Sequence, residues 1–287
     1  MTNFALDRPQ VIEAPLESNA LYRLANQDVS FQADARADLT DFFWPWADSA
    51  YAKSINITVS APREDEIVPM VAHLHPGSLE TIMGTEGVII SKQLTVPLGS
   101  SYDRSALWIL DCQAEGDRLL QVDVEIDWGE PLEQRMVDGL LVAQANPGPA
   151  QGIYQQHNAD STRVFGNPEG RPHVAEIDDP QRAYLSYYVL INGEIEFQFL
   201  FTVSDVGEQV AWNGFLALRD AAKVAEKSGQ TWQEYLNAGR LWTPNPEFNF
   251  LINTSKIVAI QSLQRLRSGM APVGRLVEDV SSLIDVW

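Results

Sequence analysis

Cysteine and basic residues are scarce in this chain of 287 residues, and each shortage excludes a class of protein. The single cysteine, Cys112, cannot form an internal disulfide or a cysteine-based metal cluster, and we expect it to be a small packed side chain. Lys and Arg number 20 against 39 Asp and Glu, so the net charge is −19. Because this charge repels nucleic-acid phosphates and anionic membrane surfaces, we expect neither as a partner.

Long apolar runs and phosphate-binding glycine motifs are missing as well. No run reaches the roughly 20 apolar residues of a membrane span, and the first residues lack the basic start and apolar core of a signal peptide. We therefore expect a cytoplasmic protein without a membrane span. There is no Gly-X-Ser-X-Gly elbow and no dinucleotide or phosphate loop, so we expect no bound cofactor.

The first two hundred residues alternate between apolar and polar side chains, which is typical of half-buried strands. The clearest run is 119–128, and 54–60 repeats the pattern. Residues 182–203 predict a hairpin, because Asn192-Gly193 suits a type I′ turn between two aromatic-rich runs. One face of the second run carries Ile195, Phe197, Phe199, Phe201 and Val203.

Short loops rich in proline and glycine separate these runs, and no internal repeat of fixed period is present. The fold class is therefore predicted to be mainly β, as a large sandwich of antiparallel sheets. Residues 1–200 contain 30 acidic and 12 basic residues, whereas 201–287 contain 9 and 8. This shift in composition predicts two units, a sandwich over 1–203 and a helical region over 204–287.

Two helices are expected directly after the last strand. Asp205 and Glu208 form a capping-box pattern ahead of a helix that runs from Val206 through Lys227 and ends at Ser228-Gly229. A second capping box at Thr231 and Glu234 predicts another helix, which Gly239 ends.

A third helix is predicted to start with Asn245 as its cap and Pro246 in its first position. We expect Gly269 to end it, and its inner stripe to consist of Leu251, Ser255, Val258, Ser262, Leu263 and Leu266. An amphipathic pattern over 276–287 still runs at the final residue, so we expect the natural protein to continue beyond it.

The order of these parts resembles the N-terminal region of the six-hairpin glycosidases, which include the bacterial glucoamylase-like enzymes. Residues 242–249, Trp-Thr-Pro-Asn-Pro-Glu-Phe-Asn, and 251–256, Leu-Ile-Asn-Thr-Ser-Lys, look like that family's entry to its helical barrel. The segment 205–241, with Trp232 and Leu236, is similar to its linker. The resemblance implies a large antiparallel β-supersandwich, linker helices, and the start of an α/α barrel that this chain does not complete.

The resemblance also implies a function, namely the non-catalytic sandwich and linker of a glycan-processing enzyme. We favour a glycoside hydrolase that cleaves O-glycosidic bonds. In that family the catalytic carboxylates lie in the barrel, so we assign no catalytic residue to this chain. The implied partners are the enzyme's own C-terminal barrel and, through the complete enzyme, an oligo- or polysaccharide. Arg275, Asp285 and Trp287 are candidates for sugar contacts at the barrel's inner wall.

Trp44-Pro45-Trp46 is the candidate sugar-binding surface on the sandwich. Indole faces stack on sugar rings, and the proline holds the two rings in a stiff extended turn. Packing at the end of the sandwich core is the alternative interpretation. We expect Asp123, Glu125 and Asp127 to form a solvated face, because no apolar pocket raises their pKa values.

His73 and His75 lie on one side of a predicted strand, at a spacing that metals can use. A third ligand such as His157 or His173 would have to come from elsewhere in the chain. We favour two strand-end histidines without a metal.

Three other functions stay open at this point. A self-contained carbohydrate-binding module would bind glycans through Trp44 or Trp46. A glycoside phosphorylase shares the plan of a sandwich followed by a barrel. A docking protein would pair with another subunit through residues 205–287.

Overall fold

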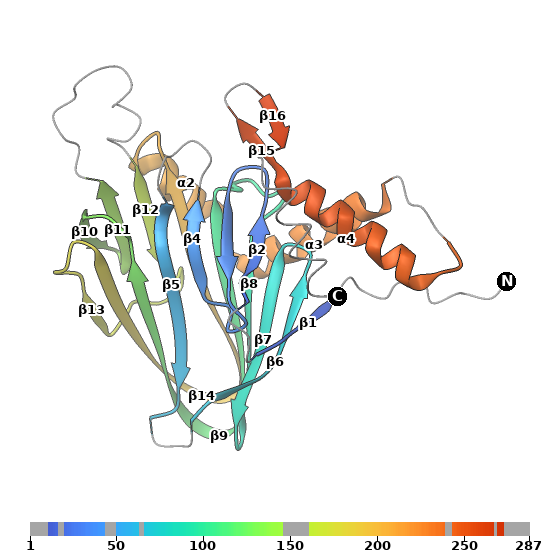
Figure 1. Cartoon of the computed structure of the whole chain (residues 1–287). Helices are drawn as coiled ribbons and strands as arrows, with labels where there is room; N and C mark the ends of the chain where they lie inside the picture. The colour runs from blue at the N-terminus through green and yellow to red at the C-terminus, as the bar shows by residue number, and fades with distance from the viewer. Residues whose placement is uncertain are drawn as a thin grey trace, which may run out of the picture.

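The computed structural model describes residues 11–16, 20–43, 50–62, 66–145, 161–238, 243–266 and 269–272. Within these residues, fourteen strands form one large curled antiparallel sheet (Figure 1). Two strands of 23 residues each, β9 (Ser105–Asp127) and β14 (Arg182–Ser204), pair along nearly their whole length and form its spine. The predicted fold class, an antiparallel sandwich followed by helices, is confirmed.

The spine belongs to two half-sheets. The start of β9 pairs with β8, and the end of β14 pairs with β12, which gives the first half-sheet the order β1-β6-β7-β8-β9-β14-β12-β11-β10. The end of β9 pairs with β5, and the start of β14 with β13, so the second half-sheet runs β2-β3-β4-β5-β9-β14-β13. The other strands are β1 (Ile12–Ala14), β2 (Tyr22–Ala25), β3 (Ser30–Ala33), β4 (Leu39–Phe43), β5 (Ala50–Ser60), β6 (Val68–His75), β7 (Ser78–Thr85), β8 (Val88–Thr95), β10 (Leu132–Val137), β11 (Leu140–Ala145), β12 (Thr162–Gly166) and β13 (Val174–Glu176).

The predicted hairpin at Asn192-Gly193 is wrong. The two aromatic runs form the single strand β14, and a register shift lies between Ile191 and Gly193. Gly193 has φ +87°, and Gly116 of β9 has φ +77°, so both spine strands contain a glycine in the left-handed region where they change from one half-sheet to the other. The irregularity therefore acts as a bulge in a continuous ladder rather than as a chain reversal.

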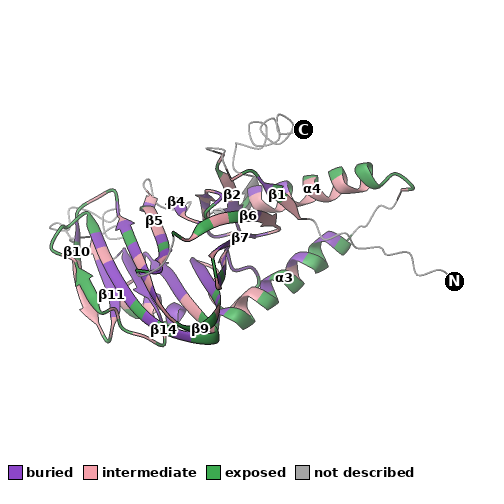
Figure 2. Cartoon of the chain, turned by 90° about the horizontal axis from the view of Figure 1, so that it is seen from below, coloured by how far each residue is buried: buried purple, intermediate pink, exposed green. Residues whose placement is uncertain are grey.

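The alternation of apolar and polar residues is confirmed in both spine strands. Leu120, Val122, Val124, Ile126 and Trp128 are buried, and all five predicted inner residues of 195–203 belong to or pack against the same core. Figure 2 shows the buried residues along the strands. The carboxylates of Asp123, Glu125 and Asp127 lie on the opposite face of β9, as expected for a strand with one wet side.

Polar groups join the two half-sheets through the core. The ammonium of Lys92 on β8 is buried and donates to the carboxylate of Asp38 and to the carbonyl of Ile57 (2.7 Å). Trp108 Nε1 on β9 donates to the carbonyl of Ala37 at 3.0 Å. Arg163 on β12 donates to the carbonyl of Tyr51 at 2.8 Å. These hydrogen bonds fix how the half-sheets face each other.

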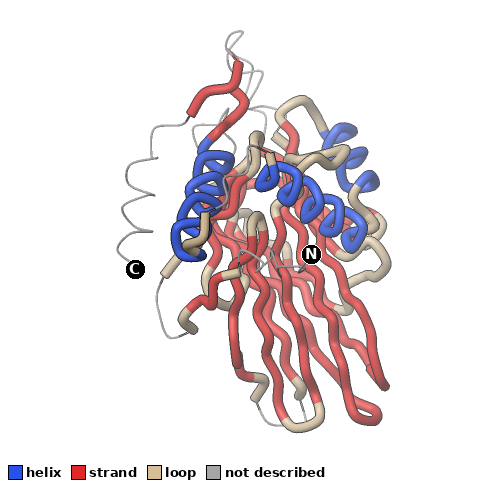
Figure 3. The backbone as a smooth tube through the Cα atoms, turned by 90° about the vertical axis from the view of Figure 1, so that its right-hand side faces the viewer, coloured by secondary structure: helices blue, strands red, loops and turns tan. Residues whose placement is uncertain are grey.

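Helices α2 (Glu208–Ala217) and α3 (Ala221–Asn237) follow β14. They cover the outer face of the first half-sheet (Figure 3). A second apolar cluster forms beneath them. None of the helices among the described residues is long and apolar enough to cross a membrane.

The predicted end of the second helix before Gly239 is confirmed, since α3 ends at Asn237 with Ala238 as its C-cap. The predicted break between the two helices and the predicted N-cap of the first are wrong. The break falls at residues 218–220, where Asp220 caps α3 by accepting from Lys223 N, and α3 runs unbroken through Ser228-Gly229 and Thr231. Gly207 rather than Asp205 is the N-cap of α2, and no side chain caps that helix.

Helix α4 (Pro246–Ser262) starts as predicted, since the Asn245 side chain accepts from the N–H groups of Glu247 and Phe248. It ends at Ser262, and two short strands follow, β15 (Leu263–Leu266) and β16 (Gly269–Pro272). The predicted inner stripe is only partly correct. Val258 and Ser262 are buried, whereas Leu251, Ser255 and Leu263 are exposed.

Candidate functional site

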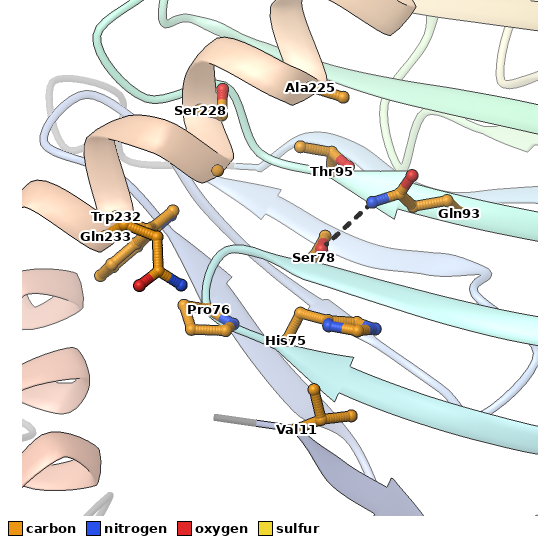
Figure 4. A pocket seen from close by; sticks show the side chains of 11 residues that line it. Val11, His75, Pro76, Ser78, Gln93, Thr95, Ala225, Ser228, Trp232 and Gln233 are labelled. Atoms are coloured by element: carbon orange, nitrogen blue, oxygen red, sulfur yellow. Dashed lines mark hydrogen bonds between the residues drawn. The ribbon is translucent and has the colours of Figure 1, made fainter. Parts of the chain in front are cut away.

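The candidate site is a cavity of about 200 Å³ between helix α3 and the strands β6, β7 and β8 (Figure 4). Its lining consists of Val11, His75, Pro76, Ser78, Gln93, Thr95, Ala225, Ser228, Gly229, Trp232 and Gln233.

The sheet side of the cavity is polar. Ser78 and Thr95 are register partners on β7 and β8, and alternation along β8 puts Gln93 on the same face as Thr95. Gln93 Nε2 donates to Ser78 Oγ at 3.3 Å. Figure 4 shows these three side chains on the strands that face α3. The sheet side of the cavity is therefore formed by polar residues, although the Thr95 hydroxyl itself is buried.

The helix side is fixed by two close contacts. Ser228 Oγ donates to the carbonyl of Val224 at 2.8 Å and accepts from the N–H of Leu98 at 3.0 Å, so it joins α3 to the loop after β8. Trp232 is 2% exposed and packs on Gly77 of the β6–β7 turn. Gly77 has φ +75°, and a Cβ there would lie 2.2 Å from Trp232 Nε1. Glycine is thus required twice at this turn, for its backbone angle and for its lack of a side chain.

Two buried polar atoms at the cavity have no hydrogen-bond partner within the described residues. They are the indole Nε1 of Trp232 and the hydroxyl of Thr95, which is 3% exposed. A buried polar group without a partner costs about 1–3 kcal/mol. Both residues line one cavity, so the folded chain carries this cost twice in the same place.

His75 connects the cavity to a carboxylate on the neighbouring strand. Its Nε2 lies 3.5 Å from Glu80 Oε2, and Ser91 Oγ donates to Glu80 Oε1 at 2.7 Å. The hydrogen bond from His75, followed by that from Ser91, lowers the pKa of Glu80 to about 2 against the opposing effect of burial. Because the carboxylate lies between the imidazole and the hydroxyl, the imidazole cannot act as a base on Ser91.

The two histidines of the possible metal pair do lie on one strand, β6. His73 Nδ1 is 3.9 Å from Glu80 Oε2, so both imidazoles face the same carboxylate. His173 lies elsewhere, where its Nδ1 accepts from the N–H of Tyr188 at 3.1 Å. No group of three or more metal-ligating side chains is found among the described residues, and His157 lies outside them.

A second, shallower hollow shares Gln93 with the first and contains Asp111 and Glu196, which face each other across β9 and β14. Burial, and then the other carboxylates nearby, raise the pKa values of both groups. Both residues are exposed and have similar surroundings. Acid and base roles require environments that push two pKa values apart, so this pair is not arranged for glycosidic cleavage.

The residues that the sequence singled out for sugar contact, Trp44, Trp46, Arg275, Asp285 and Trp287, lie outside the described residues. Cys112 is the packed side chain that was expected, since it is buried and its pKa is raised to about 12 by burial. The cavity was missed, because hydroxyl and amide residues on a strand also fit a solvent-facing side.

No protein-family model and no curated protein matches this chain. Several solved structures do match it in fold. A protein assigned as a kojibiose phosphorylase from the human microbiome superposes with a TM-score of 0.61 at 11% identity, over 84% of this chain and 39% of that one. This chain has the fold of a sandwich region of glycan-processing enzymes.

A family GH92 inverting mannosidase from Bacteroides thetaiotaomicron gives the same fold likeness, with a TM-score of 0.51 and 11% identity, over 89% of this chain and 39% of that one. The chain thus spans about two fifths of each enzyme. The resemblance to the glycosidase sandwich region is confirmed as a likeness of fold.

Proposed function

We propose that this chain is the non-catalytic sandwich and linker part of a glycan-processing enzyme, a glycoside hydrolase that cleaves O-glycosidic bonds. In this proposal residues 1–203 form the sandwich and 204–287 form the linker and the start of a helical catalytic module. The enzyme acts in the cytoplasm on an oligo- or polysaccharide, and Arg275, Asp285 and Trp287 contact the sugar from the start of that module.

The observation that carries the proposal is the contrast between the linker helices. Helices α2 and α3 bury apolar residues against the sandwich, among them Phe215 and Trp232. Helices α2 and α3 each leave one large apolar side chain exposed, Leu216 and Tyr235, whereas α4 exposes two neighbours, Phe248 at 48% and Leu251 at 51%. Residues three positions apart share one face of a helix, so these two side chains form a continuous apolar stripe.

The stripe suits the helical module proposed to follow it. Large apolar side chains that remain exposed on a folded chain mark interaction sites when they are contiguous. The two superposed enzymes are more than twice as long as the part that this chain matches, so a chain of their length has room for a further module. The stripe would then be buried between linker and catalytic module.

The first test is the reading frame. Sequencing beyond codon 287 should find several hundred further codons with the periodicity of paired helices, whereas an in-frame stop directly after codon 287 would refute the proposal. Purified 1–287 should show no turnover of oligosaccharides, and hydrolysis at enzymatic rates by this chain alone would also refute it.

The second test is the stripe itself. In the complete enzyme, the double substitution Phe248→Ser and Leu251→Ser should lower glycan cleavage at least tenfold, since about 1.4 kcal/mol of lost docking energy corresponds to a factor of ten. Leu190→Ser is the matched control, because Leu190 is 70% exposed and lies on strand β14. Equal activity of both variants would remove the docking role.

A glycoside phosphorylase is the alternative reaction. The likeness to the protein assigned as a kojibiose phosphorylase motivates this alternative, although at 11% identity it supports the fold alone. Cleavage by the complete enzyme that requires inorganic phosphate and releases a sugar phosphate would select the phosphorylase. Cleavage in phosphate-free buffer would select the hydrolase.

A further inference from the structure

We propose that residues 276–284 form a helix that packs antiparallel to α4. It covers four exposed residues along α4 and its C-cap, which together form the outer stripe of α4, namely Leu251, Ser255, Ala259 and Leu263. The inference rests on the proposed function only in taking 276–284 to be the start of the helical module. Residues 273–287 lie outside the described part of the chain, so their packing is inferred from their sequence and from the described residues that lead to them.

The outer stripe is a continuous surface without charge. Leu251 is 51% and Leu263 is 37% exposed, and Ser255 and Ala259 between them are exposed as well. Residues four positions apart lie on one face of a helix. A surface helix normally carries charged residues on the face that points away from the core, and the outer stripe carries none. Its pattern is therefore that of a face that another element covers.

The polar groups of α4 allow this face to be buried. The charged residues of the helix are Glu247, which lies in the first turn before the stripe, and Lys256. Lys256 Nζ donates to the carbonyls of Leu236 and Ala238 at 3.0 and 2.9 Å, so its charge lies at the end of α3. Ser255 Oγ donates to the carbonyl of Leu251 at 2.9 Å. A cover over the outer stripe would thus leave the Ser255 donor paired.

The chain after α4 returns to the end of this stripe. Strands β15 and β16 are antiparallel and pair Leu263 with Pro272, and Figure 1 shows their hairpin at the C-terminal end of α4. Paired residues of this kind lie about 5 Å apart. The three residues 273–275 can span about 10 Å, which is the distance between the axes of two packed helices. A helix that starts there and follows the stripe must run antiparallel to α4.

The sequence of 276–284 suits this position. Its apolar residues recur at the spacing of one helix face, and they are Leu276, Val277, Val280, Leu283 and Ile284. Glu278 and Asp279 fall in the first turn, where the helix dipole favours negative charge. At 1.5 Å per residue the segment would measure about 14 Å, against about 18 Å from Leu251 to Leu263. Asp285 and Trp287 would lie beyond it, which leaves them for the sugar contact proposed above.

The test is disulfide formation within chain 1–287, with oxidised glutathione as the oxidant. Antiparallel packing brings Val280 opposite Ser255, so the pair Ser255→Cys and Val280→Cys should crosslink within one chain. The matched control is Ser255→Cys with Ser282→Cys, because Ser282 is two residues away on the opposite face of the proposed helix. Cys112 is buried and its pKa is raised to about 12, so it does not compete.

The rate is followed by non-reducing gel electrophoresis, and the site of the crosslink is checked by mass spectrometry of peptides. The Val280 pair should oxidise at least about tenfold faster than the Ser282 pair, because a tail without fixed packing would present both positions at the same effective concentration. The pair Ala259→Cys and Val280→Cys detects packing that is shifted by one helical turn, and it should be compared with Ala259→Cys and Ser282→Cys.

Two outcomes overturn the inference. One is equal rates for the Val280 pairs and their Ser282 controls. The other is a disulfide that forms only between two chains, since a second copy would then cover the outer stripe. Failure of the proposed function is a separate result. An in-frame stop directly after codon 287 would refute that function and leave the crosslink unchanged, whereas an absent crosslink with a continuing reading frame would refute only the packing of 276–284.

Discussion

Replacing Gly77 by alanine should destabilise the chain through the contact between α3 and the sandwich. The alanine must adopt φ +75°, which costs about 1 kcal/mol or more for a residue with a Cβ. Its Cβ would also lie 2.2 Å from Trp232 Nε1, and Trp232 is 2% exposed and has little room to move. Overpacking of this kind costs a further 1–3 kcal/mol or so. The free energy of unfolding should therefore fall by about 2–4 kcal/mol.

The measurement is urea unfolding followed by tryptophan fluorescence, together with the Tm, which should fall by about 5–15 °C at roughly 2–4 °C per kcal/mol. Gly193→Ala is the matched control, because Gly193 has φ +87° but a Cβ there would meet nothing within 4 Å. The control should lose only the free energy that the left-handed backbone angle costs an alanine, about 1 kcal/mol or more. In a Trp232→Leu background, the effect of Gly77→Ala should shrink toward that of the control. Equal losses in Gly77→Ala and Gly193→Ala would refute the reasoning, because the indole would then contribute nothing.

Three further perturbations test other parts of the structure. Lys92→Met should lower the free energy of unfolding by about 3–5 kcal/mol in urea titrations, because it leaves Asp38 without its buried cation. Adding Asp38→Asn to the same chain should recover part of that loss. Glu80→Gln should lower the free energy of unfolding at neutral pH by roughly 1 kcal/mol. The folded pKa of Glu80 is depressed to about 2, so the unmodified chain should lose this stabilisation as pH falls from about 4.5 toward 2. A plot of Tm against pH should therefore be flatter for the variant. Gly229→Ala should raise the free energy of unfolding by about 0.5–1 kcal/mol, since Gly229 lies inside α3 with open space around its missing Cβ, and a lower Tm would contradict this.

The strands were predictable because a period of two depends only on which face of each strand is covered. The run 119–128 and the face of Phe199 and Phe201 needed no knowledge of their partners. Predicting which strands pair did require knowledge of those partners. Asn192-Gly193 is compatible with a reversal and with a bulge, and the sequence favours the reversal. The neighbouring strand β9, about eighty residues earlier in the chain, supplies partners on both sides of Gly193 and keeps the strand continuous.

The helix boundaries failed for a related reason. Ser228-Gly229 is a stop signal for an isolated helix, yet Ser228 forms two hydrogen bonds in the fold, one of them to Leu98 N, 130 residues away in sequence. Asp220 caps α3 without a capping-box pattern, because Lys223 rather than Glu or Gln lies three residues after it. Glu208, which was expected to form a capping box with Asp205, instead pairs with Arg135 of β10. Contacts with the sheet therefore decide which of the local start and stop signals end or begin a helix.

The surface of the sheet under the helical cover differs between α2 and α3. Where α2 and the start of α3 lie on the sheet, the strands beneath present Leu107, Val164 and Leu200, and the contact is a closed apolar cluster. Where the end of α3 lies on the same sheet, the strands present Ser78, Gln93 and Thr95, and a cavity remains. An apolar strip under the whole of α3 would be more favourable for packing alone, because each buried polar group without a partner lowers stability. Helix α3 is therefore held on the sheet by specific contacts, namely the packing of Trp232 on Gly77 and the hydrogen bond that Leu98 N donates to Ser228 Oγ.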